Sequence, residues 1–130
     1  MNTVIEGDKV TIQKSQKEVF DILSVPANFS RIMPDDVAKF EAGDNWFIFG
    51  LKGMPEVKLV VRETESPSKV VLGSASDKLD FQLVGKFEDH EDQTIAQLLF
   101  EGQFNPMLKM MVERPLRNFL QKLTEKLSSL

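Results

Sequence analysis

The feature that most constrains this chain is a regular series of turn signals between residues 36 and 104. Clusters rich in Gly, Pro, Asn, Asp and Ser mark these turns at 43–45, 53–55, 66–68, 76–78 and around His90. The intervals between them, roughly ten to thirteen residues, suit one strand each. Connections this short join antiparallel neighbours, because a parallel crossover needs about a dozen residues or more. We therefore predict an antiparallel meander of six strands, at about 37–42, 45–51, 56–65, 69–75, 79–88 and 94–104.

Several of these strands alternate between apolar and polar residues, which predicts a sheet with one buried face and one solvated face. Their inward-facing residues include Leu59, Val61, Phe81, Leu83, Leu98 and Phe100. The strand 45–51 differs, because it is apolar in both phases. Either a partner covers its outer face, or it forms a modest exposed patch, or its outer residues are scattered surface aromatics.

The N-terminal part combines a strand signal with a helix signal. Residues 3–13 carry β-branched side chains on both sides of Gly7-Asp8, which predicts a first strand with a bulge at the glycine. Ser15-Gln16-Lys17-Glu18 fits a capping box, in which the serine caps a helix and the glutamate reaches back to it. We therefore expect a short helix from about 16 to 24.

Two further helices are expected, one short and one long. Pro26 suits the first position of a second short helix, which Pro34 stops. From 106 to 129, an apolar stripe lies opposite a polar face, which predicts an amphipathic helix. At 1.5 Å per residue it would be roughly 36 Å long, enough to cross most of a seven-strand sheet. Pro115 should kink this helix or restart it.

The order of these elements predicts an α+β fold. The dry face of the sheet must be covered, and the C-terminal helix is the one long element available for this. We therefore expect a curved seven-stranded antiparallel sheet wrapped around that helix, with the two short helices between strands one and two. A single helix does not fill the concave side of such a sheet, so a cavity between the sheet and the helix is expected. The 130 residues suit a single domain, 1–130.

Composition excludes several classes of function. Lys and Arg number 16 against 20 Asp and Glu, so the formal charge is −4 and no nucleic-acid partner is expected. The chain has no cysteine, which removes thiolate nucleophiles and cysteine-ligated zinc. It has no tyrosine, and its one histidine, His90, lies in a polar cluster typical of a solvated turn. No glycine-rich phosphate-binding motif occurs, and we expect no cofactor and no metal site.

The sequence also predicts where the protein works. Its apolar runs of about four residues are far shorter than the roughly twenty that a membrane span needs, so no stable membrane insertion is expected. The first residues lack the basic and apolar regions of a secretory signal. A cytoplasmic location follows as an expectation.

Three segments resemble the START-like superfamily, also called SRPBCC, which includes lipid-transfer domains, plant pathogenesis-related proteins and polyketide cyclases. Residues 15–23 are similar to its capped first helix with a Val-Phe or Val-Trp pair. Residues 25–34 resemble the segment that enters its meander, and Gly102-Gln103-Phe104 leads into a long helix as in those proteins. The resemblance covers essentially the entire chain and implies a helix-grip fold that holds an apolar ligand between sheet and helix. Members of this superfamily share a fold far more than a function.

This fold would place apolar residues of the sheet, the last helix and the second short helix around the cavity. The candidate ligand-binding residues are Phe29, Ile32, Met33, Trp46, Ile48, Leu59, Val61, Phe81, Leu83, Leu98, Phe100, Met107, Met111 and Pro115. The alternative is that they pack against each other as an ordinary core. The phase of Trp46 is open, because its strand is apolar on both faces. The methionines suit ligand contact, because flexible thioethers adapt to apolar surfaces.

Three functions compete. The leading one is a carrier or sensor of a small apolar molecule such as a lipid, an isoprenoid or a polyketide. The second is an enzyme of the cyclase or aromatase type, with Arg31, Arg62 or Glu63 as its polar groups. Glu63 shares the phase of the inward residues before it, so it is either an inward base or a solvated strand-end carboxylate. The third is a protein-interaction module or homodimer that uses the strand 45–51.

Overall fold

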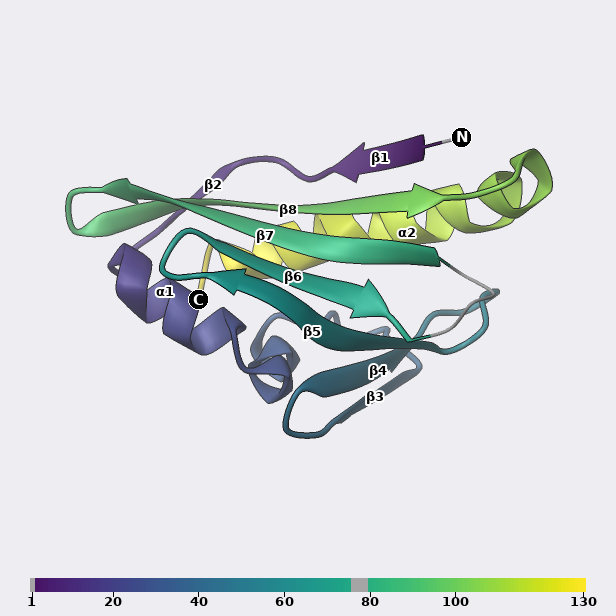
Figure 1. Ribbon diagram of the computed structural model, residues 1–130, viewed down its shortest axis with the longest axis horizontal. Coiled ribbons are helices and arrows are strands. Elements are labelled where there is room, and N and C mark those ends of the chain that lie inside the picture. The colour runs from purple at the N-terminus through teal and green to yellow at the C-terminus, as the bar shows by residue number, and fades with distance from the viewer. Residues whose placement is uncertain (1, 76–79) are drawn as a thin grey trace.

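The computed structural model describes residues 2–75 and 80–130 of the chain. Eight antiparallel strands form one sheet, and the long helix α2 (Pro106–Leu127) packs on it (Figure 1). Two short helices lie between the second and third strands. This is the predicted α+β helix-grip architecture, with one strand more than expected. Within the described residues, no helix combines the length and the apolar character needed to cross a membrane.

The additional strand arises because the predicted first strand is divided into two. β1 (Asn2–Glu6) and β2 (Val10–Ile12) both pair with β8 (Gln93–Gln103), and Gly7 lies between them. The N–H of Gly7 donates to the carbonyl of Leu98 at 2.9 Å. A Cβ at this position would lie 2.7 Å from the hydroxyl oxygen of Thr124 in α2. The glycine therefore lets the sheet edge approach the helix closely.

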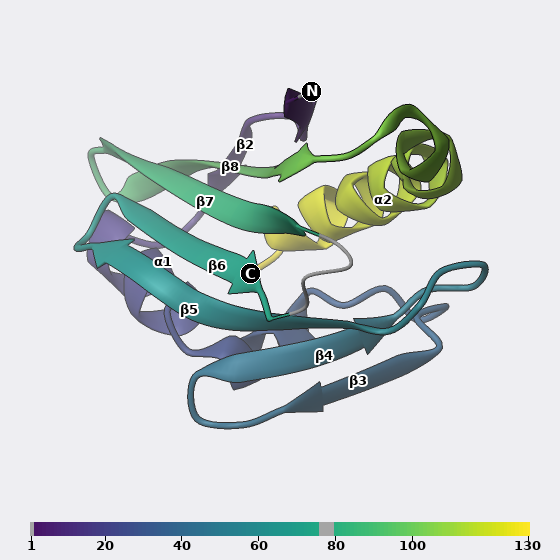
Figure 2. The same cartoon turned by 45° about the vertical axis from the view of Figure 1, so that its right-hand side comes forward.

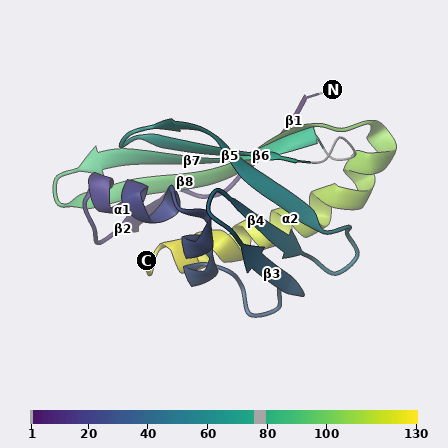
Figure 3. The same ribbon diagram turned by 60° about the horizontal axis from the view of Figure 1, so that its bottom comes forward.

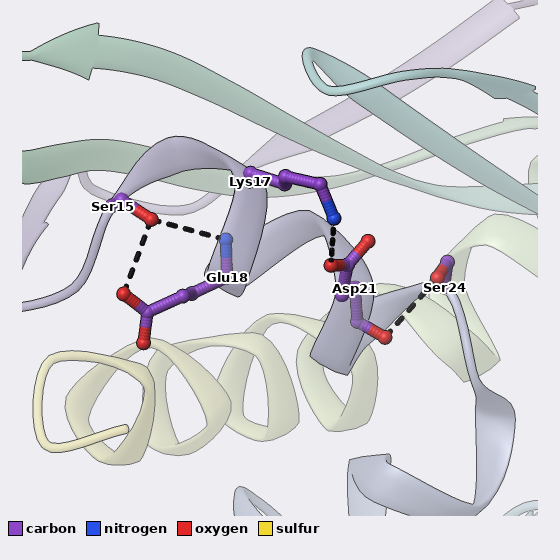
Figure 4. Close-up of polar contacts among 5 residues, drawn as sticks. All are labelled: Ser15, Lys17, Glu18, Asp21 and Ser24. Atoms are coloured by element: carbon purple, nitrogen blue, oxygen red, sulfur yellow. Dashed lines mark hydrogen bonds and ion pairs between the residues drawn. The ribbon is translucent and has the colours of Figure 1, made fainter.

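The capping prediction for the first helix is confirmed. α1 (Gln16–Leu23) begins after Ser15, whose hydroxyl oxygen accepts from the N–H of Glu18 at 3.3 Å (Figure 4). The same hydroxyl donates to the Glu18 carboxylate at 3.2 Å, so the glutamate meets the side chain of the cap. Lys17 and Asp21 form an ion pair one turn apart, at 2.7 Å. After α1, Pro26 opens η1 (Pro26–Arg31), a short 3-10 helix.

The predicted meander is present in the predicted order. The remaining strands are β3 (Lys39–Ala42), β4 (Trp46–Gly50), β5 (Val57–Glu65), β6 (Lys69–Ser74) and β7 (Asp80–His90). Each pairs antiparallel with the next, giving the order β1-β8-β7-β6-β5-β4-β3. The turn expected at 76–78, and the first residue of the strand expected at 79–88, lie outside the described residues.

A bulge in β5 changes which face its later residues occupy. Val61 pairs with Leu72, and after an irregularity Glu63 pairs with Val71. Leu72 belongs to the main core, whereas Val71 belongs to a small cluster on the opposite face of the sheet. Glu63 is therefore exposed on the outer face, and an inward orientation is wrong. The alternation rule failed here because one extra residue reverses the phase of a strand.

α2 is continuous across its internal proline. Its N-cap is Asn105, whose side-chain oxygen accepts from the N–H of Leu108 at 2.8 Å. The helix does not restart at Pro115, because a single helical span runs from Pro106 to Leu127. Val112 and Leu116, on either side of the proline, are buried in the same core. Figures 2 and 3 show α2 lying along the sheet, with α1 on the same side, near the turn that joins β7 and β8.

Candidate functional site

Aromatic rings occupy the interior between the sheet and α2. Eight phenylalanines form one linked network: Phe29, Phe40, Phe47, Phe49, Phe81, Phe100, Phe104 and Phe119. Phe119 of α2 lies at its centre, stacked on Phe49 with ring centroids 4.8 Å apart and 6.4 Å from the ring of Phe100. The space in which we predicted a cavity is thus filled to a large extent by the chain itself.

Most of the candidate residues are gathered in this interior. Buried members are Phe29, Ile32, Met33, Leu59, Phe81, Leu83, Leu98 and Phe100. Val61 is half-buried against the same core. Their burial agrees with the predicted phases of the strands, and it is also what an ordinary core would show. Whether any of them contacts a ligand stays a prediction.

Trp46 and Ile48 do not face the interior. In β4 the inward positions belong to Phe47 and Phe49, which are both 0% exposed. Trp46 lies on the outer face, where the ammonium of Lys58 is 4.7 Å from the centre of its ring. Alternation could not decide this, because β4 is apolar in both phases. The register decides it, since Phe47 lies opposite the inward residue Leu59 on β5.

The methionines at the start of α2 are also placed differently from the prediction. Met107 is 75% exposed and Met111 is 56% exposed, so neither lines the interior. The inward side of these turns is taken by Leu108 and Val112, which pack against the core. The sequence shows apolar residues on two sides of this part of the helix, and the sheet covers only one of them. Pro115 is half-buried and lies at a surface hollow.

This hollow, of about 170 Å³, lies between α2 and the segments before β3 and after β4. Its lining residues are Asp36, Leu51, Lys52, Pro115, Asn118, Phe119 and Lys122. Phe119 is the member that connects it to the aromatic interior, because this ring also stacks on Phe49. Sequence reasoning missed Phe119 and Leu51 as site residues, although Phe119 lies on the predicted apolar stripe of the helix.

Two ion pairs tie the loop before β3 to α2 beside the hollow. Lys122 donates to the carboxylate of Asp36, and Lys126 lies 3.3 Å from the carboxylate of Asp35. The hydrogen bond from Lys122 lowers the pKa of Asp36 below its usual value. Both pairs are exposed, so they position the loop rather than supply much stability.

Charged side chains lie outside the interior. Among the described residues, the buried polar side chains are Thr3, Thr94 and Thr124, and none of these is charged. Arg31 is exposed, and Arg62 extends over Gly73 on the outer face and donates to the carbonyl of Ser74 at 3.2 Å. With Glu63 on the outer face as well, the three groups that we considered for catalysis do not reach the aromatic cluster.

Two larger hollows lie elsewhere on the surface. One, of about 420 Å³, lies between the β1–β2 connection and the second half of α2, and its lining includes Glu6, Asp8, Arg117 and Glu125. Another of similar volume lies on the outer face of the sheet, around Arg62. Neither opens onto Phe119. Of the three, the small hollow is the one whose lining includes a ring of the aromatic interior.

Comparison with known proteins supports the fold. A scan against protein-family models finds no match, and a search of curated proteins by sequence also finds none. Solved structures do match. Norcoclaurine synthase from Thalictrum flavum, in complex with dopamine and hydroxybenzaldehyde, superposes with a TM-score of 0.71 at 14% identity, over 99% of this chain and 86% of the other.

Two other solved structures extend the comparison. A START superfamily protein from Mycobacterium smegmatis has a TM-score of 0.64 at 10% identity, covering 97% of both chains. The Aha1 dimer from Colwellia psychrerythraea has a TM-score of 0.60 at 16% identity, over 97% of this chain and 96% of the other. The chain therefore has the START-like, helix-grip fold that its sequence resembles. At these identities the similarity establishes the fold and not the activity.

Proposed function

We propose that this chain binds a small apolar molecule, preferably an aromatic one, between its sheet and α2, and acts as a carrier or sensor. The observation that carries the proposal is the hollow at Phe119, where the aromatic interior reaches the surface. A ligand ring that displaces the Phe119 ring would stack on Phe49 in its place. The norcoclaurine synthase structure holds dopamine and hydroxybenzaldehyde, and these small aromatic molecules support this choice of ligand class.

Binding without catalysis is the better-supported function. General acid–base chemistry needs a titratable group within hydrogen-bond reach of the reacting atoms. In the described part of the chain, no charged side chain is buried. Arg31, Arg62 and Glu63 lie outside the interior, which removes the residues on which the cyclase alternative depended.

The ligand can be sought directly by native mass spectrometry of freshly purified protein. A non-covalent adduct of small-molecule mass is expected, and N-phenylnaphthylamine serves as a neutral aromatic probe for protein without an adduct. A bound ligand should also stabilise the fold, by about 2.7 kcal/mol at a hundredfold excess over its Kd. No adduct, no probe binding and no thermal shift across a panel of aromatic compounds would contradict the proposal.

A pair of variants tests whether the ligand binds at the hollow. Asn118 is exposed and lines the hollow, so Asn118→Phe should plug the entrance and abolish probe binding while the fold stays intact. Gln121, also exposed on α2, lines the 420 Å³ hollow on the other flank of the helix, so Gln121→Phe is the matched control and should bind normally. Equal probe affinity in both variants would place the ligand elsewhere.

A protein partner or homodimer stays a separate proposal. The surface available on the strand 45–51 is smaller than its sequence predicted. Phe47 and Phe49 are covered by the chain itself, so a partner on β4 would meet Trp46 and Ile48 on the outer face. The Aha1 structure is a dimer, which supports testing self-association here. Sedimentation over a range of concentrations, with Ile48→Ser as the variant, decides whether this face is an interface.

A further inference from the structure

The first turns of α2 carry an exposed face of methionines. Met107, Met110 and Met111 are 75%, 84% and 56% exposed, the largest values among the exposed apolar side chains of the described residues. Their spacing of three and four residues puts them on one side of the helix. The opposite side holds Leu108 and Val112, which pack on the core. These three methionines, here called the methionine face, thus form an apolar patch that the fold leaves uncovered.

Positive charge accompanies this face. Residues 105–118 contain Lys109, Arg114 and Arg117 but one acidic residue, Glu113, in a chain whose net charge is −4. Glu113 and Arg117 pair with each other at 3.0 Å. Arg114 follows Met110 by four residues and Met111 by three, so it lies on the same side of the helix, and it forms no ion pair with any described residue. Its charge is therefore available to a partner, whereas Lys109, two residues from Met107 and from Met111, lies on another side. β7 begins at Asp80, which pairs with Gln103 near the start of α2 and adds one negative charge there. The positive excess therefore comes from the residues of α2.

Negative charge is concentrated at the far end of the molecule. β8 runs from the β7–β8 turn toward the start of α2, and Figure 1 shows these two features at opposite ends of the longest axis. The turn region contains the exposed acidic residues Glu88, Asp89, Glu91 and Asp92. An anionic surface would attract the positively charged start of α2, which carries the methionine face, and would repel the acidic β7–β8 turn. The charge distribution therefore orients the molecule as well as attracting it.

We propose that the methionine face docks on anionic lipid surfaces, with the methionines in the interfacial region and Arg114 against the headgroups. This inference rests on the proposed function, because a carrier of an apolar molecule must meet the phase in which that molecule dissolves. The geometry suits such a transfer, since Asn118 at the hollow follows Arg114 by one helical turn on α2.

A second copy of the chain fits this face less well. A specific protein interface takes about 800 Å² from each partner, which is more than three methionine side chains provide. Two copies would also bring Arg114 of each chain toward that of the other. A lipid surface needs no matching shape, and methionine side chains adapt to irregular apolar surroundings.

Vesicle sedimentation tests the docking. The wild type should bind vesicles of equal parts phosphatidylserine and phosphatidylcholine, bind phosphatidylcholine alone more weakly, and dissociate as salt is added. M107Q/M110Q/M111Q should bind at least about tenfold more weakly, because glutamine keeps the helix propensity and removes the apolar contact. R114Q should bind about fivefold more weakly, since each cation near an anionic surface contributes about a fivefold factor.

Matched controls separate this face from general surface effects. Val4 and Val25 are 46% and 43% exposed on other elements, so V4Q/V25Q should bind vesicles like the wild type. Lys109 is half-buried on another side of α2, and Lys86 is an exposed cation of β7, so K109Q and K86Q should each lose less affinity than R114Q. Circular dichroism confirms that each variant is folded.

Three outcomes would overturn the docking proposal. They are no binding to the anionic vesicles at low salt, equal binding by wild type and M107Q/M110Q/M111Q, and a lipid-free dimer that the methionine variant abolishes. Binding of N-phenylnaphthylamine in the absence of vesicles tests the proposed ligand site separately from vesicle docking. If N-phenylnaphthylamine does not bind but anionic vesicles do, the ligand proposal fails and the docking surface stands.

Discussion

The two halves of α2 belong to one continuous helix and differ in how many of their apolar side chains are covered. In the half before Pro115, Met107 and Met110 are 75% and 84% exposed. In the half after it, Leu116, Phe119 and Leu123 are all 3% exposed or less. The second half lies against the sheet, whereas the first turns of the helix lie at the end of the sheet (Figure 2). Apolar side chains in a helix therefore indicate burial only where a neighbouring element is present to cover them.

The largest expected difference between the halves is in stability. Phe119→Ala removes the ring at the centre of the aromatic network, so it should lower the free energy of unfolding by about 3–5 kcal/mol. Met110→Ala removes an exposed side chain and should change it by less than about 0.5 kcal/mol. Urea denaturation measures both values. Similar losses in the two variants would mean that the Met110 side chain is packed against a neighbouring element.

A second prediction concerns the proline between the halves. Pro115 has no N–H for a helical hydrogen bond, so Pro115→Ala should restore one and stabilise the chain by about 1–3 kcal/mol. Hydrogen exchange should slow in residues 106–114, because the first half gains a stronger connection to the anchored half. A less stable variant would instead show that the contacts of the proline ring in the hollow outweigh the missing hydrogen bond.

The smallest effect is expected at the ion pair beside the hollow. Lys122 lowers the pKa of Asp36 in the folded chain, so the pair stabilises the fold above the unfolded pKa of about 3.9. This contribution is lost as the pH falls through the folded pKa. Asp36→Asn should therefore lower the Tm slightly at neutral pH and leave it unchanged in strong acid. Lys17→Gln, at an exposed ion pair in α1, is the control for loss of a surface charge.

Much of the fold follows from local patterns in the sequence. Turn signals at ten-to-thirteen-residue intervals predicted the meander, Ser15 predicted the start of α1, and the apolar stripe over 106–129 predicted α2. These signals are readable because a cap, a tight turn and a strand period depend on residues within a few positions of each other. The resemblance to the START-like superfamily, confirmed at the level of the fold, rests on the same local features.

The candidate site was less predictable, because its residues depend on contacts between distant segments. Trp46 could not be separated from Phe47 by pattern, since both phases of β4 are apolar and the pairing with β5 decides between them. Glu63 changed face through a bulge that the sequence does not mark. The exposure of the methionine face depends on where the sheet ends.

By itself, the sequence determined the order and type of the elements, the apolar composition of the interior, and the lack of cysteine and tyrosine. The tertiary structure decided which apolar residues are inside, how far the rings fill the expected cavity, and that the hollow at Phe119 connects them to the surface. The physical reason is the range of the interactions. Backbone propensity and capping act between near neighbours, whereas strand register and side-chain packing are settled only when the whole sheet and α2 come together.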